Sequence, residues 1–97
     1  MTNSDILAML KSNLQLIGTT WDEYLTQLIE VSTREIGREG VVLDTSQIDD
    51  VNLIVMYASY LYRKRNTDGP MPRMLRYALN NRLFAGKLES KGMNYDL

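Results

Sequence analysis

The apolar run "LIVMYASYLY", Leu53–Tyr62, constrains the fold more than any other stretch of this sequence. It lies within a segment from about Gln47 to Arg65 that we predict to be one helix. A helix that is apolar on every side has to be surrounded by protein on every side. Because a domain this small has few other helices to cover it, we expect part of this helix to contact a second chain.

Three further segments carry apolar residues at helical spacing, with polar residues that can cap them. Asn3 or Ser4 can cap the first, and Thr20 with Glu23 forms a capping-box pattern at the start of the second. Pro72 suits the first turn of the last, where its missing N–H group is no loss. The spacing therefore predicts helices over about residues 4–14, 20–37 and 71–85.

The predicted fold is all-α, a single domain over residues 1–97 built as a small bundle of about four helices. We find no convincing strand, and we interpret the short apolar stretch 41–43 as a packed loop. The helical core spans about residues 4–85. The remaining segment, 86–97, has two glycines and no clear periodicity, so we expect a mobile C-terminal tail.

Two missing residue types narrow the classes of function. The chain has no cysteine and no histidine, which excludes disulfides and thiolate metal sites and removes the commonest general base. Asp49 and Asp50 are adjacent carboxylates, but at a helix start they are best explained by capping and by the helix dipole. We therefore expect no enzyme activity, no cofactor and no metal site.

The sequence also lacks the segments that direct a chain to a membrane. No apolar stretch approaches the roughly 18 residues that cross a bilayer. The N-terminus "MTNSDILAML" lacks the basic start and cleavage site of a signal peptide. We expect a protein that acts or is assembled inside a cell, with no membrane partner.

The charge of the chain is unevenly distributed, although its net value is only −1. Residues 1–59 contain nine acidic and three basic side chains, a net −6, while residues 60–97 contain eight basic and three acidic ones, a net +5. Such polarity suits head-to-tail contact between copies. It also arises when solvated helix faces simply differ in charge.

The basic residues of the last third suit either nucleic acid or protein. Five cations gather there, namely Arg63, Lys64, Arg65, Arg73 and Arg76. Because phosphate neutralisation dominates nucleic-acid affinity, one alternative is a small nucleic-acid-binding regulator that uses the basic helix pair 60–84. Yet the pI is about 5.3, whereas dedicated binders are usually basic. We favour pairing of these arginines with carboxylates of a neighbouring copy.

Two tyrosines of the apolar run also indicate a contact between subunits. Tyr60 and Tyr62 point about 200° apart on a helix, so both cannot face one core. One of them is therefore a candidate for an interface. Taken together, the residues that we predict to contact another subunit or a partner are Tyr60, Tyr62, Arg63, Arg65, Arg73 and Arg76.

A family resemblance is carried by three segments that occur in this order: "TWDEYLTQLIEVSTREI", "DDVNLIVMYASYLYRKR" and "MPRMLRYALNNRLF". With the short helix before them, they resemble the phage head–tail connector, or adaptor, family. The resemblance covers about residues 4–85 and rests on hydrophobic pattern and a few side chains. A third interpretation is a generic helical adaptor that binds a cellular protein through the apolar third helix.

The resemblance implies a structural role in a virion. Such proteins are small α-helical subunits of tailed phages and prophages, and they form a ring, typically dodecameric, beneath the portal at the capsid vertex. The implied partners are further copies of the chain, the portal protein, and the next head-completion or tail protein. DNA would pass through the channel without sequence-specific binding. The implied location is the head–tail interface of the virion, after assembly in the bacterial cytoplasm.

Overall fold

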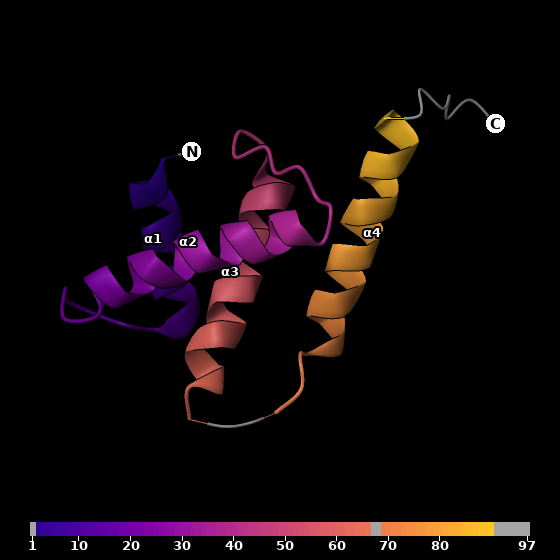
Figure 1. Cartoon of the computed structure of the whole chain (residues 1–97). Coiled ribbons are helices and arrows are strands. Elements are labelled where there is room, and N and C mark those ends of the chain that lie inside the picture. Colours follow the sequence, from indigo (N-terminus) through magenta and orange to yellow (C-terminus); the bar gives the residue numbers. More distant parts are fainter. Residues whose placement is uncertain (1, 67–68, 91–97) are drawn as a thin grey trace.

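The computed structural model describes residues 2–66 and 69–90, with side chains described as far as Lys87. Its elements are four helices, α1 (Asn3–Leu14), α2 (Asp22–Arg38), α3 (Ile48–Lys64) and α4 (Arg73–Ser90), and the described residues contain no strand. α1 and α2 pack on each other and on α3, which also contacts α4 (Figure 1). The all-α prediction is confirmed.

A capping box starts α1, one position earlier than predicted. The Thr2 hydroxyl accepts a hydrogen bond from the Asp5 N–H group, and the Asp5 carboxylate accepts one from the Thr2 N–H group. The hydrogen bond from the Thr2 N–H group to the carboxylate, together with the nearby Thr2 hydroxyl, favours the charged form and lowers the pKa of Asp5. Asn3 and Ser4, the predicted caps, lie inside the first turn instead. The helix ends at Leu14, and the next residue, Gln15, caps it with a left-handed φ of 58°.

The predicted capping box of Thr20 and Glu23 is wrong. Thr20 lies in a turn, and α2 begins at Asp22 after Trp21, which makes no side-chain capping hydrogen bond. A tertiary contact holds this helix start instead, because the Lys11 ammonium lies 2.7 Å from the Asp22 carboxylate. The start of α2 is therefore fixed by α1 rather than by its own flanking residues.

α3 is the central helix, and most of its apolar run is covered by its own chain. Every residue from Leu53 to Tyr62 is buried or half-buried. The polar member of the run, Ser59, is also buried and donates a hydrogen bond to Asn13 of α1. α1, α2 and α4 cover most of the run, but Met56, Tyr60, Leu61 and Tyr62 keep part of their surface exposed. The expectation that part of this run contacts a second chain stays a prediction.

The boundaries of the last helix differ most from the prediction. α4 begins at Arg73, directly after Pro72, and continues to Ser90. Residues 86–90, which we expected in a mobile tail, are therefore helical, since one glycine within a run of helix-forming residues is tolerated. The rest of that predicted tail, 91–97, lies outside the described residues. The stretch 41–43 is a loop, as predicted.

Candidate interaction surface on α4

α4 packs on the rest of the molecule through a stripe of leucines. Leu75 and Leu79 are buried, and Leu83 is half-buried one turn further along. The Leu83 side chain lies against Gly40, where an added Cβ atom would come within 3.1 Å of it. Gly40 also has a φ of 101°, a conformation that L side chains rarely adopt. Its small size and backbone freedom therefore allow the chain to leave α2 and α4 to approach.

An ion pair fixes the middle of α4 to the start of α3. The Nε atom of Arg82 lies 2.7 Å from one carboxylate oxygen of Asp50, and its Nη2 atom lies 3.2 Å from the other. The same Nη2 atom donates to the carbonyl of Val42 at 2.8 Å. Asp50 also accepts a hydrogen bond from the backbone N–H of Asp44. Since Asp50 is only 3% exposed, this pair joins α3, the 41–44 loop and α4 inside the protein.

The loop that Asp50 holds is itself ordered by a second carboxylate. Asp44 accepts hydrogen bonds from the hydroxyl and the backbone N–H of Ser46. Both bonds favour the ionised form, so the pKa of Asp44 is lowered from its usual value. The turn before α3 is therefore held by hydrogen bonds from Asp44 to Asp50 and from Ser46 to Asp44.

A second, more exposed ion pair joins the first turn of α4 to the end of α2. Arg76 donates to both carboxylate oxygens of Glu39, with distances of 2.7 and 3.3 Å. The hydrogen bond that Arg76 donates to Glu39 raises the pKa of Arg76. Two arginines of the basic half thus pair with carboxylates of the acidic half inside one chain. This use of the charge asymmetry differs from the pairing between copies that we expected for Arg76.

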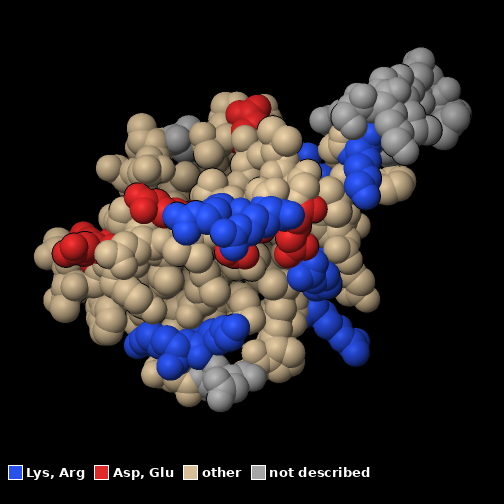
Figure 2. Space-filling view, in the orientation of Figure 1, with Lys and Arg blue, Asp and Glu red and all other residues tan. Residues whose placement is uncertain are grey.

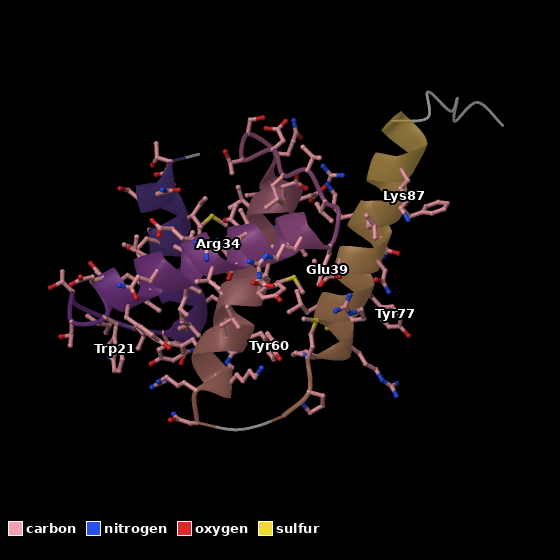
Figure 3. The ribbon with its side chains drawn as sticks, viewed as in Figure 1. Trp21, Arg34, Glu39, Tyr60, Tyr77 and Lys87 are labelled. Atoms are coloured by element: carbon pink, nitrogen blue, oxygen red, sulfur yellow. The ribbon has the colours of Figure 1, made fainter. Side chains whose placement is uncertain are left out.

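The opposite side of α4 presents aromatic side chains to solvent. Tyr77 and Phe84 are each 64% exposed, and Met74 at the edge of this side is 75% exposed. Figure 3 shows Tyr77 directed away from the other three helices. With 100° between successive residues, four exposed residues fall within an arc of about 60°. We call them the outer face of α4: Arg73, Tyr77, Asn80 and Phe84.

Two of the residues predicted to contact another subunit are engaged in a stack at the end of α3. The Tyr62 ring meets Trp21 edge to face, with 5.9 Å between ring centroids. The Arg65 guanidinium lies 3.9 Å from the centre of the Tyr62 ring and 5.1 Å from that of Trp21. It also donates to the Tyr62 carbonyl and hydroxyl. Tyr62 and Arg65 therefore close the end of the bundle.

The other predicted contact residues separate into two places. Tyr60 is half-buried, packs edge to face on Tyr57 and lies under the ammonium of Lys64. Arg63 is exposed beside it, and Arg73 is exposed on the outer face of α4. The structure thus brings Tyr60 and Arg63 together on α3 and places Arg73 beside Tyr77.

Charge is also mixed on the visible surface. In Figure 2, basic and acidic side chains lie side by side across the middle of the molecule. Some opposite charges are directly paired, since Glu35 and Arg38 of α2 are 2.8 Å apart. A surface of this kind differs from the single-sign stripe that nucleic-acid-binding proteins present to phosphates.

Sequence reasoning missed the residues that hold α4 in place. We interpreted Asp50 as one of two helix-start carboxylates and gave Arg82 no role. The signal that could have found the pair is positional. Arg82 lies seven residues after Leu75 and three after Leu79, so it projects from the apolar face of its helix. A cation on that face needs a buried carboxylate or carbonyl partner.

A metal-binding cluster and a membrane-spanning helix are both missing from the described part of the chain. Within residues 2–66 and 69–87, no group of three or more metal-binding side chains could hold an ion. None of the helices described here is both long enough and apolar enough to cross a membrane. No protein family, curated protein or solved structure matches the chain. The feature most suited to an intermolecular role is the outer face of α4.

Proposed function

We propose that this protein is the subunit of a phage head–tail connector, which assembles into a ring beneath the portal and extends the DNA channel toward the tail. The observation that carries the proposal is the aromatic outer face of α4. Tyr77 and Phe84 lie in "MPRMLRYALNNRLF", one of the three segments on which the resemblance to that family rests. Aromatic residues and arginine are enriched in the centres of protein interfaces.

The proposed subunit contact differs from the one that sequence reasoning favoured. Most of the apolar run of α3 is buried inside the chain, so the main contact is assigned to the outer face of α4, with Arg73 beside Tyr77 and Phe84. Arg65 and Arg76, held by the Tyr62 stack and by Glu39, keep the bundle and α4 in place. Tyr60 and Arg63 lie at a separate surface beside the α3–α4 connection.

A ring subunit has to hold its contact face in a fixed orientation. The leucine stripe, the buried Asp50–Arg82 pair and the Arg76–Glu39 pair fix α4 along its length. A face held in one orientation presents the same contact in every copy, and a repeated contact between two different faces closes into a ring. A channel lined with paired or sparse cations also lets DNA pass, because many phosphate contacts would retain it.

The nucleic-acid-binding regulator is the alternative proposal, with the helix pair 60–84 as its binding element. Its support is the exposure of Arg63, Lys64, Arg65 and Arg73. Against it stand Arg76 and Arg82, whose guanidinium groups bind carboxylates within the chain. Salt-dependent binding of the isolated protein to a DNA duplex would favour the regulator, since counterion release accompanies phosphate contact.

The experiment that tests the proposal uses the portal of the phage or prophage that carries this gene. The purified chain is mixed with purified portal rings, separated on a density gradient and viewed by electron microscopy. We expect the chain to sediment with the portal and to add a ring of density on the tail side. A portal that stays bare, with the chain folded at the top of the gradient, would contradict the proposal.

A further inference from the structure

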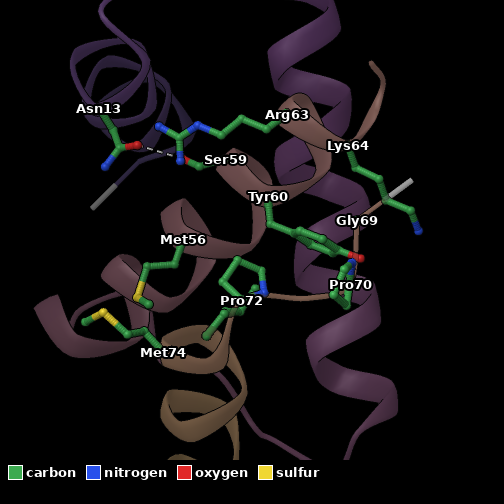
Figure 4. Close-up of a pocket in the computed structure, with 11 residues that line it drawn as sticks. Asn13, Met56, Ser59, Tyr60, Arg63, Lys64, Gly69, Pro70, Pro72 and Met74 are labelled. Atoms are coloured by element: carbon green, nitrogen blue, oxygen red, sulfur yellow. Dashed lines mark hydrogen bonds between the residues drawn. The ribbon is translucent and has the colours of Figure 1, made fainter. Parts of the chain in front are cut away.

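A cavity lies beside the connection between α3 and α4, at the end of the molecule where α4 begins. Its volume is about 310 Å³, at the lower end of the range for ligand pockets. Figure 4 shows Met56 and Met74 at one side, with Pro70 and Pro72 facing Tyr60. The walls are therefore mainly apolar.

Two cations border this cavity. Arg63 and Lys64 both line it, and in Figure 4 they leave α3 on the two sides of Tyr60. Lys64 lies 5.7 Å from the centre of the Tyr60 ring. An apolar cavity with cations at its mouth matches a peptide that carries an acidic residue between apolar ones.

The chain contains such a peptide beyond its described residues. Residues 93–97 read "MNYDL", in which Asp96 stands between Tyr95 and Leu97. We propose that this segment of one copy docks in the α3–α4 cavity of the next copy, with Tyr95 or Leu97 inside and Asp96 at Arg63 and Lys64. The inference rests on the proposed ring and supplies its second subunit contact.

Geometry favours a neighbouring copy over the same chain. The 18 residues of α4 span about 27 Å at 1.5 Å each, and the cavity lies at the beginning of this helix. Figure 1 shows the end of α4 far from the end of α3. From Ser90 to Asp96, a fully extended chain reaches about 20 Å. Asp96 could approach Lys64 of its own chain only if the whole segment ran back fully extended along α4, whereas a neighbouring copy sets no such condition.

The proposed contact between the tail and the cavity is directional, because it joins two different surfaces of the subunit. The cavity and the docking segment lie at opposite ends of α4, so each copy gives its tail to one neighbour and receives the tail of another. This head-to-tail arrangement joins two different surfaces and produces a ring or an open row of subunits. The outer face of α4 remains available, since none of its four residues lines the cavity.

Cysteine cross-linking tests the inference in the full chain, which has no native cysteine. Gly69→Cys places a thiol beside the cavity, where an added Cβ meets no atom within 4 Å, and Asn94→Cys places one in the tail. Under mild oxidation we expect a ladder of species beyond the dimer. The matched control, Gln27→Cys with Asn94→Cys, should give at least tenfold less. No ladder, a ladder that stops at the dimer, or an intramolecular link would overturn the inference.

Charge reversal provides a second measurement. Lys64→Glu and Asp96→Lys should each weaken self-association about tenfold, and the combination should restore it. Circular dichroism confirms folding of each variant. If Lys64→Glu assembles like the unchanged chain, the inference is wrong while the connector proposal stands. If the ladder forms but the portal stays bare, the connector proposal is wrong while the tail contact stands.

Discussion

The Arg82 guanidinium on α4 holds both carboxylate oxygens of Asp50 on α3, and the carboxylate is almost wholly removed from water. The two residues are 32 positions apart in the chain. Together with the leucine stripe and the Arg76–Glu39 pair, this contact fixes where α4 lies on the bundle, and so where Tyr77 and Phe84 face solvent.

Removing Arg82 should destabilise the protein strongly. In Arg82→Ala the Asp50 carboxylate stays buried without its cation, and breaking a buried pair in this way costs about 3–5 kcal/mol. The measurement is the free energy of unfolding in urea. The matched control is Arg76→Ala, whose more exposed pair with Glu39 should contribute at most about 1 kcal/mol. Equal losses for the two variants would show that Asp50 is solvated in the folded protein.

Gly40 should be intolerant of a side chain, and Gly37 should not be. In Gly40→Ala the new methyl group meets Leu83 and the φ of 101° becomes strained, so we expect a loss of about 1–2 kcal/mol. Gly37 lies in α2 with nothing near its Cβ position. Gly37→Ala should be neutral or stabilise by up to about 1 kcal/mol. Thermal unfolding of both variants checks the contrast.

The outer face of α4 should matter for assembly and not for folding. Tyr77→Ser and Phe84→Ser alter exposed side chains, so each should change the free energy of unfolding by less than about 0.5 kcal/mol. Both should reduce ring formation on the portal, because aromatic residues contribute disproportionately to interfaces. Leu79→Ala is the comparison within the same helix. It removes a buried side chain and should cost about 2–5 kcal/mol.

Tyr57 makes stability sensitive to alkaline pH. Burial raises the pKa of its phenol, and the carboxylates of Glu35 and Glu39 add to the shift. A raised pKa means that the folded state holds this proton more tightly than the unfolded state. Stability is therefore lost as the pH rises above the ordinary tyrosine value of about 10.

Spectrophotometric titration checks that expectation. In the folded protein, tyrosine absorbance should show a late step that disappears in Tyr57→Phe. Unfolding the protein in denaturant should move the step back to the ordinary range. A titration that is unchanged by Tyr57→Phe in the late part would mean that Tyr57 is solvated.

The sequence was sufficient for the helices and insufficient for their contacts. The spacing of apolar residues places all four helices, because burial of one face dominates helix formation in a small domain. The predicted caps of two helices were wrong. Thr2 rather than Asn3 or Ser4 caps α1, and an ion pair with Lys11 rather than a Thr20 cap holds the start of α2. Local patterns offer several caps, and tertiary contacts decide among them.

The candidate surface was predicted only in part, for a physical reason. An apolar run predicts burial but does not say whether the cover is its own chain or another. For Leu53–Tyr62 most of the cover is its own chain, and the two most exposed aromatic residues among those described, Tyr77 and Phe84, are on α4 instead. An arginine likewise predicts a carboxylate partner, but the sequence does not identify that partner. In the structure, Arg76 pairs with Glu39 and Arg82 pairs with Asp50. Both carboxylates belong to the same molecule rather than to a neighbouring copy.

The most direct test of the central claim is electron microscopy of portal rings mixed with the unchanged chain and, in parallel, with the double variant Tyr77→Ser and Phe84→Ser. We expect a closed ring of added density with the unchanged chain and bare portals with the folded double variant. Bare portals in both samples, or identical rings in both, would contradict the assignment of the subunit contact to the outer face of α4.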